Sequence, residues 1–158
     1  MDTFTKVHVV ISLIGIASGL VVLFGMLSAQ RFDRWTALFL LSTLATSVTG
    51  FLFPFHGVTP GIVVGIISVV VLAIAIFARY PHHLRGRWRW IYVVSALVAL
   101  YLNVFVLIAQ LFQKVPQLKA LAPTQSEPPF AITQLGVLVL FGLLGIVATI
   151  KFRVASRA

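Results

Sequence analysis

The chain has 158 residues, of which 60% are hydrophobic and only 9% charged, and it carries a net charge of +9 and no cysteine. Soluble domains carry about 25% charged residues, so this composition excludes an ordinary soluble fold and predicts one all-α membrane domain over residues 1–158. The lack of cysteine excludes disulfides, thiolate metal sites and covalently attached c-type haem.

The predicted elements are five apolar segments, each close to the roughly 20 residues that a helix needs to cross the hydrocarbon core. They cover residues 7–29, 35–55, 61–78, 90–112 and 130–150. We therefore predict a bundle of five transmembrane helices. The first segment is expected to be retained and not cleaved as a signal peptide, because it is long and because most of the nearby positive charges follow it.

Small residues in the first three segments predict where the helices pack. Gly15 and Gly19 are four residues apart in the first segment, and Gly61 and Gly65 are four apart in the third. This spacing lets helix backbones approach closely, which matters because lipid gives helices no hydrophobic reason to associate. The second segment adds a dense set of hydroxyls, namely Ser42, Thr43, Thr46, Ser47 and Thr49. We expect these residues to form packing contacts and not to bind a ligand.

Basic residues mark one side of the predicted membrane. Nine of the 12 Lys and Arg residues follow the first segment, separate the third from the fourth, or follow the fifth: Arg31, Arg34, Arg79, Arg85, Arg87, Arg89, Lys151, Arg153 and Arg157. Short basic loops stay in the cytoplasm, so the N-terminus should lie outside and the C-terminus inside. Such loops also attract anionic lipid headgroups, the partner expected here in preference to nucleic acid. The residues expected to contact headgroups are Arg79, His82, His83, Arg85, Arg87 and Arg89.

Residues 113–129 form the one long loop between predicted segments, and the orientation places it outside. Prolines interrupt this loop, but residues 117–122 could form one or two helical turns, and Ser126 or Glu127 could cap the last helix. Connections of this length are either functional or linkers. We expect this one to be a contact surface for another protein.

Stronger polar residues gather on the outer side of the predicted bundle. His8 begins the first segment, His56 follows the second, and Asn103, Gln110 and Gln134 lie towards the outer ends of the fourth and fifth. Two imidazoles at one depth could ligate a metal ion or both axial positions of a b-type haem, and the amides could line a pocket for a quinone-like ligand. Interfacial histidines that bond loop backbone are the simpler interpretation, so we expect no cofactor.

The sequence contains no complete catalytic pattern. Residues 16–19 resemble an intramembrane serine protease motif, but position 16 is isoleucine where glycine is expected, and no later segment supplies a histidine base. Glu127 is the only acid in residues 113–129, so paired-carboxylate chemistry lacks its second group. The segment centres carry none of the ionisable residues that proton-coupled transport normally places there. The sequence therefore favours a protein without catalysis of its own.

Three stretches carry a resemblance to a group of known proteins: Thr-Gly-Phe-Leu-Phe-Pro-Phe at 49–55, Tyr-Leu-Asn-Val-Phe-Val at 101–106, and Leu-Ala-Pro-Thr-Gln-Ser-Glu-Pro-Pro-Phe at 121–130. On these motifs the chain resembles small multi-pass proteins of the bacterial inner membrane whose function is uncharacterised. The resemblance implies a location in the bacterial inner membrane and implies no chemistry.

We interpret the chain as an accessory or assembly subunit of a larger membrane complex. Its expected partner is another membrane protein or a second copy of itself. The alternative is a redox or lipophilic-ligand binding protein that holds a metal, a b-type haem or a quinone-like ligand at the outer side, near His8 and His56.

Overall fold

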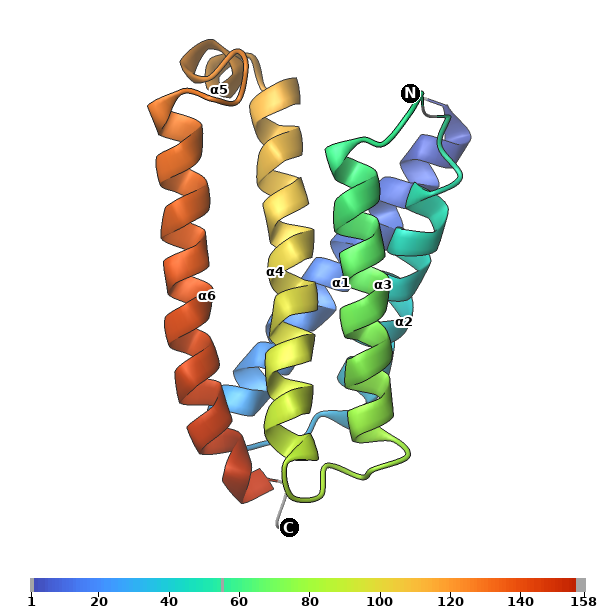
Figure 1. Cartoon of the computed structure of the whole chain (residues 1–158), viewed down its shortest axis with the longest axis vertical. Helices are drawn as coiled ribbons and strands as arrows, with labels where there is room; N and C mark the ends of the chain where they lie inside the picture. The colour runs from blue at the N-terminus through green and yellow to red at the C-terminus, as the bar shows by residue number, and fades with distance from the viewer. Residues whose placement is uncertain (1, 55, 156–158) are drawn as a thin grey trace.

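The computed structural model describes residues 2–54 and 56–155 (Figure 1). Within these residues the regular structure is entirely helical. The helices are α1 (Thr3–Leu27), α2 (Asp33–Gly50), α3 (Pro60–Arg79), α4 (Trp88–Lys114), α5 (Pro116–Leu121) and α6 (Pro128–Ala155). Four of them, α1, α3, α4 and α6, are long and apolar enough to cross a membrane. The prediction of an all-helical fold is therefore confirmed, and these four helices fit a membrane protein.

Capping residues explain why two helices begin before the predicted segments. The side chain of Asp2 accepts a hydrogen bond from the backbone N–H of Thr5 (2.7 Å), so α1 begins at residue 3. The hydroxyl of Thr59 accepts from the N–H of Ile62 (3.3 Å), and Pro60 occupies the first position of α3. Both arrangements satisfy N–H groups that have no partner within the helix.

α2 differs most from its prediction and is not among the four long apolar helices. It has 18 residues, and its first turn carries Asp33 and Arg34. The predicted segment extended to residue 55, which lies outside the described residues, whereas α2 ends at Gly50. Pro54 accounts for this end, because proline cannot donate to the helix and disfavours helical geometry in the residue before it.

The long helices run alternately in opposite directions, so the bundle has two distinct ends (Figure 1). The α1–α2 loop, the α3–α4 loop and the end of α6 lie together at one end, which we call the basic end because it gathers the basic residues that predicted the topology. Arg157, one of those residues, lies outside the described part of the chain. The N-terminus, the α2–α3 loop and α5 lie at the other end, which we call the α5 end.

Buried apolar side chains concentrate in the half of the bundle next to the basic end. α1 crosses obliquely behind α3 and α4 and contacts α6 there, so all five long helices meet in this half (Figure 1). The largest side chains that are at most 1% exposed are Tyr92, Phe39, Phe152, Met26, Leu72 and Leu100. They form one continuous core. The basic end is therefore the close-packed part of the protein.

α6 is held to the bundle along one narrow face. Only 6% of its membrane-spanning window is buried by the rest of the chain, against 39% for α1, 22% for α3 and 44% for α4. Its main contacts are with α4 and α1. α6 is thus a peripheral helix, most of whose surface faces the surroundings of the bundle.

Gly15 and Gly19 lie where α1 meets α2 and α4. A Cβ atom added at Gly19 would stand 2.6 Å from Cδ1 of Leu100 and 3.0 Å from ring atoms of Phe39, closer than ordinary van der Waals contact. At Gly15 the nearest atom would be Oγ1 of Thr43, at 3.2 Å. A larger residue at either position would push α1 away from its neighbours, so both glycines lie at close helix contacts.

The two predicted glycines of α3 differ from each other. A Cβ atom added at Gly65 would stand 2.8 Å from Cε1 of Phe51, in the turn that follows α2. Gly61 is exposed, and its added Cβ would meet only Oγ1 of Thr59, at 3.8 Å, in the cap of its own helix. Gly65 therefore lies at a close contact with the turn after α2. Gly61 makes no close contact with another helix, although its spacing predicted one.

Candidate functional site

His8 lies on α1 beside the end of α2. Its Nδ1 is 2.7 Å from Oγ1 of Thr49, and its ring meets the ring of Phe53 edge-on, with centroids 5.0 Å apart. The hydroxyl of Thr49 donates its single proton to the carbonyl of Ala45 (2.7 Å), so Nδ1 of His8 must be the donor in the first bond. This contact selects the Nδ1–H tautomer and leaves the lone pair of the ring on Nε2.

Asn103 makes a separate polar contact, between α4 and α2. Its Nδ2 donates to Oγ1 of Thr43 (3.1 Å), at the place where Gly15 gives α1 no side chain. Thr43 precedes Thr49 by about 9 Å along α2, at 1.5 Å per residue. Asn103 and the α1 histidine therefore bind α2 at different depths.

Gln134 and Gln110 take part in neither of these two contacts. Nε2 of Gln134 donates to the backbone carbonyl of Phe105 on α4 (3.1 Å), and its Oε1 is buried without a hydrogen-bond partner. Gln110 is exposed. Gln134 thus joins α6 to α4, and it does so by bonding to backbone, not to another of the residues predicted to form a pocket.

His56 stands in the loop after α2 and is exposed, with no hydrogen bond to any residue that the structure describes. In the described ranges there is also no group of three or more His, Cys, Asp or Glu residues able to hold a metal ion. The hydrogen bonds therefore distribute the predicted pocket residues over separate contacts between helices. None of these bonds links two of the predicted residues to each other.

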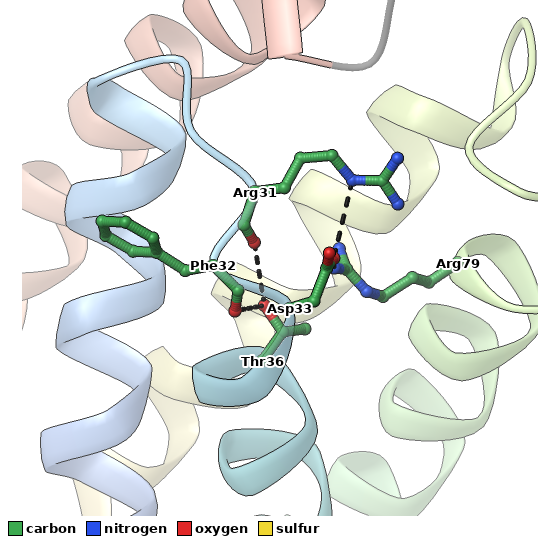
Figure 2. A network of polar contacts seen from close by, with 5 residues as sticks. All are labelled: Arg31, Phe32, Asp33, Thr36 and Arg79. Carbon is green, nitrogen blue, oxygen red and sulfur yellow. Dashed lines mark hydrogen bonds and ion pairs between the residues drawn. The ribbon is translucent and has the colours of Figure 1, made fainter. Parts of the chain in front are cut away.

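Arg79 and Asp33 form a charged pair inside the basic end (Figure 2). Nη2 of Arg79 donates to Oδ1 of Asp33, and Nε of Arg31 lies 3.6 Å from the same oxygen. The side chain of Arg79 is only 3% exposed, whereas that of Asp33 is 70% exposed. The pair therefore joins the end of α3 to the start of α2 with its cation inside the protein and its anion at the surface.

The guanidinium of Arg79 also lies over the ring of Tyr92 on α4, with its carbon 5.2 Å from the ring centroid. Tyr92 is 1% exposed, and Nη1 of Arg79 is buried without a hydrogen-bond partner. A cation held by a carboxylate and an aromatic face ties α2, α3 and α4 together. Arg79 was predicted to contact lipid headgroups, but in the structure its guanidinium is enclosed by protein.

The other residues predicted to contact headgroups lie around the α3–α4 loop. The ring of His82 stacks on Trp88, with centroids 3.9 Å apart and planes 9° from parallel, so His82 also has a packing role. Nη1 of Arg89 donates to the carbonyl of Thr149 (2.7 Å) and joins α4 to α6. The exposed members of the set are His83, Arg85 and Arg87.

An open apolar groove of about 480 Å³ runs between α4 and α6. Its α4 wall comprises Val94, Leu97, Val98 and Tyr101, and its α6 wall comprises Leu138, Phe141, Gly142, Gly145, Ile146, Thr149 and Ile150. The groove exists because Gly142 and Gly145 give α6 no side chain there. None of the histidines lines it.

The loop that carries α5 is ordered by Glu127. Its carboxylate accepts from the backbone N–H groups of Thr124 (3.2 Å) and Ser126 (3.1 Å) and from the hydroxyl of Thr124 (2.8 Å). Desolvation raises the pKa of Glu127, but these hydrogen bonds to the ionised carboxylate outweigh it, so the pKa lies below the ordinary value of 4.5. Glu127 therefore folds the loop back on itself. The predicted helical turns are present as α5.

Sequence reasoning missed both the Asp33–Arg79 pair and the groove. Asp33 carried a usable signal, because it is one of only three acids and directly follows a basic loop. The burial of Arg79 had no such signal, since it depends on Tyr92 from another helix. For the groove, the only trace in the sequence is Gly142 and Gly145, three residues apart in the last apolar segment.

Comparison of the chain with models of protein families, with curated proteins and with solved structures finds no match.

Proposed function

We propose that this protein is a non-catalytic subunit of a larger membrane complex, in which it serves as an accessory or assembly component. The observation that carries the proposal is the exposure of α6, of whose membrane-spanning window only 6% is buried. α6 can pack against a helix of another membrane protein while α4 and α1 still hold it in its own bundle. A second copy of this chain is the simplest such partner, and a different membrane protein is the other.

One face of α6 is suited to this role. No heavy atom lies within 4 Å of the place where a Cβ of Gly136 would stand. Leu140, Leu143 and Val147 follow at helical spacing on the same face and are 52%, 59% and 41% exposed. Helices in lipid associate by close packing of such small and branched residues, so we assign the partner contact to this face, which we call the Gly136 face.

Within this proposal the protein lies in the bacterial inner membrane with its basic end in the cytoplasm. α2 crosses beside α1, so the chain passes five times and its N-terminus lies outside. Two observations support this arrangement. The N-terminus and the end of α6 lie at opposite ends of the bundle, as an odd number of passes requires (Figure 1). The basic residues gather at one end, which is the pattern of cytoplasmic loops.

Assembly is tested by comparing two substitutions that introduce the same side chain at two exposed positions. Gly136→Phe alters the Gly136 face, whereas Val70→Phe alters α3 at a position that is 53% exposed. After extraction from native membranes in a mild detergent, the wild type and Val70→Phe should elute with a partner at a fixed ratio, and Gly136→Phe should elute alone. Wild-type protein that elutes as a monomer after chemical cross-linking in the membrane would overturn the proposal.

Orientation is tested separately with single cysteines in a chain that has none of its own. An impermeant thiol reagent applied to intact cells should label Thr124→Cys in the α5 loop and leave Arg85→Cys in the α3–α4 loop unlabelled. The reverse pattern would contradict the proposed orientation without affecting the assembly test.

A further inference from the structure

The basic residues of the basic end differ in whether the protein itself binds their side chains. Arg79 is paired with Asp33, and Arg31 lies near the same carboxylate. Arg89 donates to the carbonyl of Thr149. Four exposed basic side chains make no hydrogen bond, ion pair or ring contact with any residue that the structure describes: Arg34, Arg85, Arg87 and Lys151. We call these four residues the unpaired cations.

The chain has no anion of its own to offer the unpaired cations. It has three acids in all, and two of them, Asp2 and Glu127, lie at the α5 end (Figure 1). The third, Asp33, already lies between Arg79 and Arg31. Like charges gathered at one end of a bundle create a positive potential, so the basic end attracts anions from outside the chain.

Aromatic rings beside the unpaired cations indicate which anions these are. Trp35 directly follows Arg34, and Trp90 lies one turn after Arg87, and both tryptophans are 47% exposed. Tyr80, at the end of α3, is 45% exposed. Such rings prefer the zone where lipid headgroups meet hydrocarbon. The anions of that zone are the phosphates and charged headgroups of phospholipids, which therefore fit this end better than an acidic segment of a soluble protein.

We infer that the unpaired cations form a binding surface for anionic phospholipids, which gather around the basic end in preference to zwitterionic ones. Arginine side chains bind a phosphate with two parallel hydrogen bonds, and a lysine adds a point charge. The surface differs from the set of residues that the sequence predicted. Arg79 and His82 make contacts within the protein, whereas Arg34 and Lys151 join the surface from α2 and α6. It is also separate from the Gly136 face, so it does not require the proposed partner.

The tryptophans of the chain can report on this surface. All three, Trp35, Trp88 and Trp90, lie at the basic end. The full-length protein is reconstituted into vesicles of phosphatidylglycerol and phosphatidylcholine with the same acyl chains. In each sample one of the two lipids carries bromine on its chains, which quenches tryptophan fluorescence on contact. At equal mole fraction, brominated phosphatidylglycerol should quench more strongly, because it is enriched beside the unpaired cations.

Charge removal tests which residues cause the enrichment. A basic residue near the membrane surface strengthens attraction of anionic lipid about fivefold. Arg85→Gln combined with Arg87→Gln should therefore lower the preference for phosphatidylglycerol by a factor of about five or more. Raising the salt concentration should lower the preference of the wild type as well, since salt screens exposed charges. This second measurement decides the question if the double variant does not reconstitute.

Lys114→Gln combined with Lys119→Gln is the matched control. It removes the same charge from two exposed positions at the α5 end, far from the tryptophans. The quenching by each lipid should therefore stay as in the wild type. Gly136→Phe should also leave the quenching unchanged, because it alters no charge.

Three outcomes would overturn the assignment. Equal quenching by the two brominated lipids in the wild type would show that water alone solvates the cations. An unchanged preference in the Arg85→Gln, Arg87→Gln variant would place the lipid at other groups. Loss of a co-purifying protein from that variant, with no lipid preference in the wild type, would assign the surface to an acidic protein. Loss of the partner from Gly136→Phe bears on the proposed function alone.

Discussion

At the basic end, all five long helices converge on large buried side chains and on a cation enclosed by protein, whereas at the α5 end they meet through separate polar and aromatic contacts. Met26, Phe39, Leu72, Tyr92 and Phe152 belong to the first region and are each at most 1% exposed. His8 with Thr49 and Gln134 with Phe105 belong to the second. The contrast is one of packing density, since both regions are built from the same helices.

The difference shows how a small membrane bundle can combine a densely packed half with a less densely packed one. Helices in lipid gain stability from close packing and satisfied polar groups, so the basic end holds the fold together. The α5 end has separate polar and aromatic contacts but no such core, and α6 is exposed along most of its length. We therefore expect substitutions at the basic end to act on stability and those on the exposed surfaces to act on binding.

The largest effect is expected from Asp33→Ala. It removes the carboxylate and leaves the buried guanidinium of Arg79 without an anion, which costs about 3 kcal/mol of unfolding free energy. Arg31→Gln removes only a cation whose side chain is 43% exposed, and should cost less than about 1 kcal/mol. Reversible unfolding in detergent measures both. Equal costs would mean that the buried cation does not depend on Asp33.

The Asp33–Arg79 pair also predicts that removing the cation costs less stability than removing the anion. Arg79→Met removes the buried charge and leaves Asp33 at the surface, where water solvates it, so this variant should be more stable than Asp33→Ala. Replacing both residues, Asp33→Asn with Arg79→Met, should recover most of the stability that Asp33→Ala loses, because the double variant no longer buries an unpaired charge. An Arg79→Met protein less stable than Asp33→Ala would show that the cation stabilises the bundle through Tyr92 instead.

Close packing of α1 is expected to have the next largest effect. Gly19→Leu would drive atoms into Leu100 and Phe39 and should cost about 1 to 3 kcal/mol, as overpacking does in dense cores. Gly136→Leu, on the uncovered face of α6, should leave the unfolding free energy of the monomer unchanged. If the two variants unfold alike, the dense half of the bundle does not limit stability.

A smaller effect is expected where Asn103 bonds to Thr43. A double-mutant cycle with Asn103→Leu and Thr43→Val should give a coupling of about 0.6 kcal/mol, the average for hydrogen bonds between membrane helices. Additive single effects would mean that this contact contributes packing only.

The smallest effect is expected at Glu127 and depends on pH. Because the pKa of Glu127 is lowered in the folded protein, the loop is stabilised above the ordinary value of 4.5, and this contribution is lost as the pH falls through the lowered pKa. At neutral pH, Glu127→Gln should therefore speed hydrogen exchange of the Thr124 and Ser126 amides. Below the lowered pKa, wild type and variant should exchange alike. A difference that persists in acid would point to a cause other than ionisation.

The sequence by itself determined the membrane class, most of the helix positions and the gathering of basic residues at one end of the bundle. It could do so because hydropathy and charge act on each segment locally. It also marked Gly15, Gly19 and Gly65. It could not decide which polar residues meet. The sequence pattern predicted one outer side for His8, Asn103 and Gln134. In the structure each of them bonds to a different part of a neighbouring helix, because contacts between helices depend on how the helices rotate and cross. For the same reason only the tertiary structure decided that Arg79 lies against Tyr92 and that an open groove lies between α4 and α6.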